Sequence, residues 1–153
     1  MGKQAFTTLC YVERDGQYLM LYRNRKEQDI NRDKYIGIGG HLEHGETPNE
    51  CIVREAYEET GLTLKNPKLR GLITFVIDDL DEYTFLYTCD EFEGECRECD
   101  EGELVWVPVE RVPELPLWEG DRVFLPLLQT RESFFSVKLV YVNDVLTDVL
   151  IED

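Results

Sequence analysis

Three glutamates, Glu55, Glu58 and Glu59, follow one another at spacings that place their carboxylates on one side of an α-helix. Like charges at these spacings repel by about 0.2–0.5 kcal/mol per pair on an exposed helix. A divalent cation such as Mg²⁺ reverses the sign of that interaction, since it prefers carboxylate oxygens and keeps several bound waters. One of those waters is a candidate nucleophile, so the spacing favours metal-assisted hydrolysis; the plain alternative is a solvated acidic helix face.

The residues on either side of the glutamates predict the helix that positions them. Thr47 is a favourable N-cap, Pro48 suits the first helical position, and Glu50 completes a capping box. Gly61 supplies a C-terminal stop, so we expect a helix between Thr47 and Gly61. The side chains expected on its buried face are Ile52, Val53, Ala56 and Tyr57.

The overall charge narrows the class of partner. The chain carries 16 Lys plus Arg against 32 Asp plus Glu, a formal net charge of −16. Such an excess of negative charge repels polyanions, so duplex nucleic acid is not an expected partner. A small phosphate-bearing substrate would meet the same repulsion at a carboxylate-lined site unless a divalent cation lay between them, which again indicates a metal.

Length, hydropathy and cysteine usage are those of an ordinary globular chain. The 153 residues suit one domain spanning 1–153, and no linker or internal repeat interrupts them. The sequence has no apolar stretch of about 18 residues and no signal-like start, so we expect no membrane partner and a cytoplasmic location. Cys10, Cys51 and Cys89 lie in apolar runs and are expected to be reduced. Cys96 and Cys99 have the spacing of half a zinc site, but no second pair follows, so zinc is not expected.

Apolar patterns and turn residues predict a β-rich chain around the helix. The expected strands are Ala5–Glu13, Gln17–Arg23, Leu69–Ile77, Tyr83–Phe92, Leu104–Val107, Phe134–Val142 and Val145–Ile151. Asn24–Lys34 is expected to form a surface loop, and the glycine-rich stretch Tyr35–Gly40 allows backbone to approach a ligand closely. A second helix is expected over Asp121–Thr130, although Pro126 disfavours its middle.

The three glutamates belong to a longer pattern. Gly40 is followed after five residues by Glu46, and after seven more by the run Arg54-Glu55-Ala56-Tyr57-Glu58-Glu59-Thr60-Gly61-Leu62. This pattern resembles the Nudix box in every fixed position. The resemblance implies an α/β (α+β) fold, namely the Nudix-type α/β/α sandwich around a mixed β-sheet. It also implies hydrolysis of a phosphoanhydride with Mg²⁺ or Mn²⁺ as the cofactor.

The same resemblance implies roles for individual residues. The family's metal-binding positions are matched by Gly39, Glu55, Glu58 and Glu59, with Glu101 as a further ligand. The expected catalytic residues are Arg54, Glu55, Glu58 and Glu101. Arg54 matches the arginine that orients a glutamate, and Glu46 matches a supporting carboxylate. The general base is either Glu55 or Glu101, of which we favour Glu101; the alternative for Glu101 is one more acid in an acidic loop.

Within the family, the chain most resembles MutT-like 8-oxo-dGTP diphosphatases, which release a monophosphate and pyrophosphate and so clear oxidised nucleotides before they enter DNA. The segment Leu117–Leu128 resembles a purine-binding segment, in which Trp118 would stack on the base and Asp121 would bind its edge. Gly120 and Ile36 replace an acid and an asparagine of that pattern, which weakens the transfer of base specificity. Arg23 matches a basic residue on the phosphate or base side, although Trp118 as a packing aromatic and Arg23 as a solvated charge are the alternatives.

We therefore expect a small-molecule nucleotide substrate and a monomer or homodimer. The alternatives are a Nudix enzyme for nucleotide sugars, ADP-ribose or RNA caps, and a nucleotide-sensing module that has lost catalysis. The complete set of box glutamates argues against the sensor. The sequence alone does not determine which phosphorus is attacked or how many metals bind.

Overall fold

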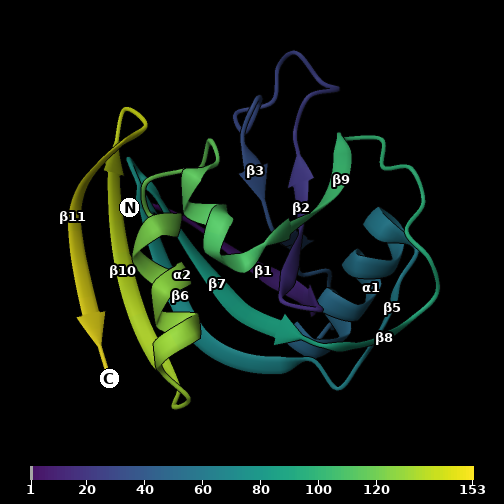
Figure 1. Cartoon of the computed structure of the whole chain (residues 1–153). Coiled ribbons are helices and arrows are strands. Elements are labelled where there is room, and N and C mark those ends of the chain that lie inside the picture. Colours follow the sequence, from purple (N-terminus) through teal and green to yellow (C-terminus); the bar gives the residue numbers. More distant parts are fainter. Residues whose placement is uncertain (1) are drawn as a thin grey trace.

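The alternation of side chains along β2 (Gln17–Tyr22) requires a sheet that is covered on both faces. Tyr18 and Met20 belong to one buried cluster, whereas Leu19 and Leu21 belong to the other. Successive side chains of a strand point to opposite faces, so a run of four buried residues needs a cover above and below. The computed structural model, which describes residues 2–153, supplies one helix on each side (Figure 1).

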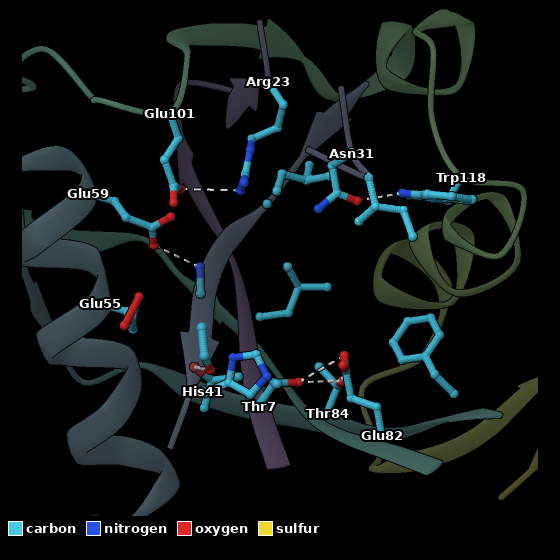
Figure 2. Close-up of a pocket in the computed structure, with 18 of the residues that line it drawn as sticks. Thr7, Arg23, Asn31, His41, Glu55, Glu59, Glu82, Thr84, Glu101 and Trp118 are labelled. Carbon is cyan, nitrogen blue, oxygen red and sulfur yellow. Dashed lines mark hydrogen bonds and ion pairs between the residues drawn. The ribbon is translucent and has the colours of Figure 1, made fainter. Parts of the chain in front are cut away.

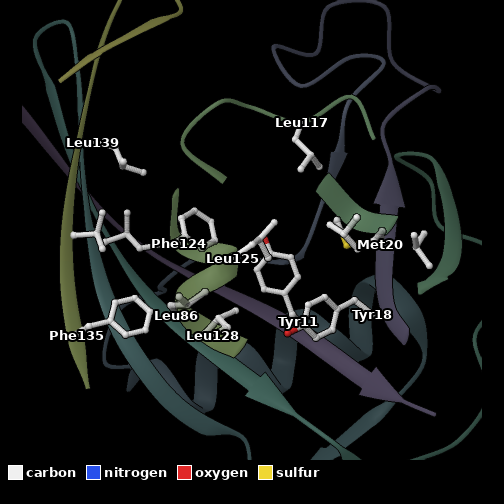
Figure 3. Close-up of a cluster of buried hydrophobic side chains, with 14 of the residues drawn as sticks. Tyr11, Tyr18, Met20, Leu86, Leu117, Phe124, Leu125, Leu128, Phe135 and Leu139 are labelled. Atoms are coloured by element: carbon white, nitrogen blue, oxygen red, sulfur yellow. The ribbon is translucent and has the colours of Figure 1, made fainter. Parts of the chain in front are cut away.

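The two covering helices build the two cores. On one face, α1 (Pro48–Thr60) buries Ile52 and Ala56. On the other face, α2 (Asp121–Thr130) contributes Phe124, Leu125 and Leu128 to the cluster drawn in Figure 3. The predicted α/β/α sandwich around a mixed sheet is thereby confirmed. Neither helix of the described residues combines the length and the apolar content that crossing a membrane requires.

The strands, including β2, form one large mixed sheet and a small two-stranded sheet. In chain order the remaining elements are β1 (Lys3–Arg14), β3 (Tyr35–Ile36), β4 (Ile38–His41), β5 (Thr63–Lys65), β6 (Lys68–Ile77), β7 (Leu80–Cys89), β8 (Glu91–Glu93), β9 (Glu103–Pro108), the 3₁₀ helix η1 (Val109–Glu114), β10 (Phe135–Val142) and β11 (Val145–Glu152). The large sheet has the order β11-β10-β6-β7-β1-β2-β3, with β4 also paired to β1 and β9 to β2. The pairs β1–β7 and β6–β10 are parallel, and the other pairs are antiparallel.

Most expected elements are present, with corrections at their ends. The connection between the expected strands Leu69–Ile77 and Tyr83–Phe92 is shorter, because β6 and β7 meet in a tight turn in which Asp78 has a φ of 52°. The expected strand Tyr83–Phe92 is divided into β7 and β8, and Tyr35–Gly40 is divided into β3 and β4. The second helix runs through Pro126 without a break. Short pairings such as β5–β8 carry too few residues to show a periodic pattern in the sequence.

The first helix forms as the sequence predicts. The Thr47 side chain accepts a hydrogen bond from the Glu50 backbone N–H at 3.0 Å, and the Glu50 carboxylate accepts one from the Thr47 N–H at 2.9 Å. Gly61 ends the helix with a φ of 84°. The expectation that Tyr57 is buried is wrong, because its side chain is 52% exposed and the Arg97 guanidinium lies 5.0 Å from its ring centroid.

Replacing the N-cap should weaken the whole fold, because α1 covers one face of the sheet. We expect Thr47→Ala to lower the free energy of unfolding by roughly 1 kcal/mol, the usual loss for a capping hydroxyl. Urea denaturation followed by circular dichroism measures this change. Thr130→Ala, at the exposed end of α2, is the control and should cost clearly less; equal losses would contradict the capping account.

Candidate active site

A cavity of about 930 Å³ opens where α1, β4 and the loop containing Glu101 face the first turn of α2. All nine residues expected to take part in binding or catalysis line it: Arg23, Gly39, Arg54, Glu55, Glu58, Glu59, Glu101, Trp118 and Asp121. Figure 2 shows Glu55, Glu59 and Glu101 on one side of the cavity and Trp118 on the opposite side. The structure thus brings together two groups that are far apart in the sequence. We call them the acidic wall, formed by Glu55, Glu58, Glu59 and Glu101, and the aromatic wall, formed by Trp118.

Arg54 connects the carboxylates of the acidic wall. Its Nε and Nη2 atoms donate to the two oxygens of Glu46 at 2.6 and 3.0 Å. Its Nη1 atom donates to Glu55 at 2.8 Å and to Glu58 at 3.2 Å. The hydrogen bonds from Arg54 to Glu46, and then one from the Glu43 backbone N–H, lower the pKa of Glu46 to about 2. The guanidinium therefore fixes Glu55 and Glu58 in place on the helix.

Glu59 is the most enclosed acid of this wall. Its Oε2 atom accepts a hydrogen bond from the Gly39 backbone N–H at 3.1 Å. Burial, and then the negative charges of Glu55 and Glu101, raise the pKa of Glu59 to about 8. Within residues 2–153 no Lys or Arg forms an ion pair with Glu59. A carboxylate in such a place is costly to ionise until a positive charge arrives.

The two glycines of β4 lie in close contact with β1 and with α1. A Cβ atom on Gly40 would lie 2.4 Å from a carboxylate oxygen of Glu55, and one on Gly39 would lie 1.9 Å from the Thr8 carbonyl oxygen. Both distances are far below van der Waals contact. Glycine at position 39 thus lets β4 pair closely with β1, and glycine at position 40 leaves room for the Glu55 carboxylate.

Glu101 reaches the acidic wall from the loop before β9. Its Oε2 atom lies 3.2 Å from Arg23 Nη1, and its Oε1 atom lies 3.8 Å from Lys26 Nζ. Arg23 also pairs through Nε with Asp29 at 2.5 Å. The expected substrate-binding arginine thus lines the cavity, but two carboxylates already hold its guanidinium.

The donor set of the acidic wall suits a hard divalent cation. In the conformation seen, no group of three or more His, Cys, Asp or Glu among residues 2–153 is arranged to hold a metal ion. Each acid has its own partner: Arg54 binds Glu55 and Glu58, the Gly39 N–H binds Glu59, and Arg23 binds Glu101. Carboxylate oxygens are nevertheless the ligands that Mg²⁺ and Mn²⁺ prefer, so the residues present fit such an ion once these side chains turn toward it.

The aromatic wall is held by contacts that the sequence did not reveal. Trp118 Nε1 donates to Asn31 Oδ1 at 2.7 Å, and its ring meets Tyr141 edge-on with centroids 5.8 Å apart. Lys34 Nζ lies 4.7 Å from the centroid of the indole. Asn31 belongs to a polar loop and Tyr141 to a distant strand, so neither gave a sequence signal. Together they fix the indole at the edge of the cavity.

Asp121 is a buried acid at the start of α2. Only 7% of its surface is exposed, and burial raises its pKa to about 7. Its carboxyl therefore carries a proton for part of the time near neutral pH, when it can donate as well as accept a hydrogen bond. Such a group is suited to contact a polar ligand edge in the cavity.

The floor of the cavity carries three more polar residues that sequence analysis missed. Thr7 and Thr84 lie opposite each other on the parallel strands β1 and β7, and their hydroxyl oxygens are 2.7 Å apart. Each hydroxyl also lies near Glu82 Oε2, at 3.3 and 3.4 Å. The sequence placed Thr7 and Thr84 in ordinary strands and Glu82 just before one, and only the pairing of β1 with β7 brings Thr7 to the other two.

Comparison with known proteins gives consistent matches. The NUDIX domain family matches residues 3–128. The chain is 30% identical over 140 residues to the uncharacterized Nudix hydrolase YvcI of Bacillus subtilis, covering 88% of this chain and 85% of the relative. It is 28% identical over 143 residues to an oxidized purine nucleoside triphosphate hydrolase of Danio rerio, covering 92% and 90%. A crystal structure of a MutT protein from Bacillus halodurans matches with a TM-score of 0.87 and 30% identity, covering 96% of this chain and 97% of that chain.

The burial of Asp121 should make stability depend on pH. The folded-state pKa of about 7 exceeds the value of roughly 3.9 for an unfolded chain, so folding disfavours ionisation. Asp121 should therefore reduce the free energy of unfolding by up to about 1.4 kcal/mol for each pH unit as the pH rises from 4 to 7. Asp121→Asn should remove this contribution, so the variant should gain on the wild type as pH rises; parallel urea-denaturation profiles between pH 4 and 8 would contradict it.

Proposed function

The chain belongs to the Nudix hydrolase family, and from that premise we propose that it hydrolyses a nucleoside triphosphate with Mg²⁺ or Mn²⁺ to a monophosphate and pyrophosphate. The observation that carries the proposal is that one cavity has the acidic wall at one side and Trp118 with Asp121 at the other. A triphosphate chain needs compensated negative charge, and a base needs a flat apolar surface. One substrate that spans the cavity would meet both requirements.

The acidic wall would hold the metal through Glu55, Glu58, Glu59 and Glu101, with the Gly39 backbone as a further oxygen donor. When bound, the ion would offset the charge of the phosphate oxygens and make a bound water more acidic. Arg54 would keep Glu55 and Glu58 oriented through the hydrogen bonds at 2.8 and 3.2 Å. Lys26 and Arg23 lie beside Glu101 and would add positive charge near the phosphates.

Two carboxylates are candidates to remove the proton from the attacking water. Glu55 is tied to Arg54 at 2.8 Å, whereas Glu101 makes longer contacts, at 3.2 and 3.8 Å, to Arg23 and Lys26. We favour Glu101, because a carboxylate that is held less tightly can turn and accept a proton with less loss of contacts. Separate Glu55→Gln and Glu101→Gln variants address this choice.

For the base, we propose an oxidised purine such as that of 8-oxo-dGTP, which would make the enzyme part of nucleotide-pool sanitation. Trp118 supplies an aromatic surface and Asp121 a buried carboxyl for the base edge. The relative from Danio rerio, whose name states this activity, supports the assignment. The glycine at position 120 has a local reason, since its N–H donates to the Tyr141 hydroxyl at 2.6 Å and a Cβ there would lie 2.6 Å from the same oxygen.

Loss of one box glutamate should remove activity and metal response without unfolding the chain. Glu58 is suited to this test because its side chain is 56% exposed. We expect Glu58→Gln to lower kcat by roughly 10²-fold or more. The rise in melting temperature on addition of Mg²⁺ or Mn²⁺ should also shrink.

The metal-free melting temperature of Glu58→Gln should stay close to that of the wild type. Glu110→Gln, an exposed acid on η1, is the matched control and should leave both activity and metal response unchanged. Full activity of Glu58→Gln would overturn the metal-binding role given to this residue.

A substrate panel tests the choice of nucleotide. With Mg²⁺ present, we expect 8-oxo-dGTP to be hydrolysed with a higher kcat/KM than dGTP, dATP, ADP-ribose, a nucleotide sugar or a capped RNA. Chromatography of the products should show a monophosphate and pyrophosphate. Comparable rates on a nucleotide sugar or on capped RNA would exclude the triphosphate assignment, and binding without turnover would favour a sensor.

A further inference from the structure

The cavity floor is the part of the sheet that α2 leaves uncovered. Along β7, Leu86 packs in the cluster beneath α2, and Thr84 and Glu82 follow on the same face at steps of two residues. Along β1, Tyr11 lies in that cluster, and Thr7 is on the same face at a distance of four residues. The side chains on this face thus change from apolar to polar where the helix ends and the cavity begins.

The two threonines fix the Glu82 carboxylate. Thr7 and Thr84 are 6% and 3% exposed, so their hydroxyls need hydrogen-bond partners inside the protein. Each threonine hydroxyl has one proton to donate. One hydroxyl therefore donates to the other threonine, and that second hydroxyl donates to Glu82 Oε2. Glu82 Oε2 is thereby anchored on the floor.

The other oxygen of Glu82 is available to a ligand. Across the described range 2–153, no group donates a hydrogen bond to Glu82 Oε1, and no Lys or Arg forms an ion pair with this side chain. An ionised carboxylate has about four acceptor positions, and the threonines use only part of those on Oε2. Glu82 therefore offers two parallel acceptor oxygens to whatever fills the cavity.

The position of Glu82 places it near a base and away from the phosphates. Figure 2 shows Glu82 at the bottom of the cavity beside Thr84, below Trp118 and on the far side of Thr7 from Glu55 and Glu59. Its direct partner across the β6–β7 pair is Phe75, which also lines the cavity. A carboxylate that threonines hold beside an aromatic side chain suits a flat ring that carries N–H donors on its edge.

We propose that Glu82 is a specificity-determining residue that accepts two hydrogen bonds from the adjacent ring N–H and exocyclic amine of a guanine-type base. This inference rests on the proposed triphosphate hydrolysis. A guanine-type edge presents two neighbouring donors that match two carboxylate oxygens. An adenine-type edge presents a ring acceptor beside its amine and is repelled, and a hypoxanthine edge lacks the amine.

Steady-state kinetics with dGTP, dITP and dATP tests the proposal, because dITP differs from dGTP only by the missing amine. We expect the wild type to prefer dGTP to dITP by roughly 10–100-fold in kcat/KM, the range for a hydrogen bond to a charged group. Glu82→Gln should reduce this preference to a few-fold, mainly through KM, with kcat on dITP little changed. It should also raise kcat/KM for dATP relative to dGTP, because an amide can donate to the adenine ring nitrogen and accept from its amine.

Two further variants complete the test. Glu82→Asp keeps the charge but withdraws it by one methylene, so it should also lose discrimination between dGTP and dITP. Asp144→Asn, which removes another acid that lines the cavity, should leave the ratio unchanged. Measuring the melting temperature of each variant checks that it is folded.

The outcomes separate the inference from the function on which it rests. A wild-type ratio near one, or an equal loss on all three substrates in Glu82→Gln, overturns the role of Glu82 while triphosphate hydrolysis stands. GTP and dGTP are also compared. If Glu82→Gln changes the ratio of kcat/KM between GTP and dGTP, and not the ratio between dGTP and dITP, then Glu82 recognises the sugar and the proposed role in base recognition is overturned. Absence of turnover on every triphosphate overturns both the function and the inference.

Discussion

The mutual repulsion of acids on one helix governs the arrangement of this protein. Glu59 faces one cavity together with Glu55 and Glu101, and the negative charges of these two acids raise the pKa of Glu59 further than burial alone does. Arg54 offsets part of this repulsion by binding Glu46, Glu55 and Glu58 at once. The remaining repulsion is the physical basis of the metal site in the proposed function, because a divalent cation would let a chain of net charge −16 bind a phosphate-bearing molecule.

The fold keeps these acids close by allowing α1 to approach the sheet. Gly40 leaves no side chain between β4 and Glu55 of the helix, and the capping box fixes where the helix begins. The second helix packs on the other face of the sheet. It covers the apolar part of β1 and β7 but stops short of Thr7, Thr84 and Glu82, so the sheet itself becomes the floor of the cavity.

The loop before β3 links the two sides of the cavity. Arg23 and Lys26 contact Glu101 on the acidic side, while Asn31 accepts a hydrogen bond from Trp118 on the aromatic side. A ligand that displaces one set of contacts therefore acts on the same segment that holds the other set. The same loop therefore contacts both sides of the cavity.

The sequence by itself determined the features that depend on neighbours along the chain. The capping box, the proline and the glycine stop define α1, and the spacing of Glu55, Glu58 and Glu59 defines its acidic side. The period-two patterns located most strands, and Tyr57 was misplaced because periodicity alone does not show where the sheet ends relative to the helix.

Only the tertiary structure decided which distant residues meet. Thr7 and Thr84 are 77 positions apart, and Asn31 and Trp118 are 87 apart. Their contacts follow from the parallel pairing of β1 with β7 and from the course of a loop, neither of which is encoded in local spacing. The chemistry of the acidic helix is thus a property of the sequence, whereas the shape and polarity of the cavity beside it are properties of the fold.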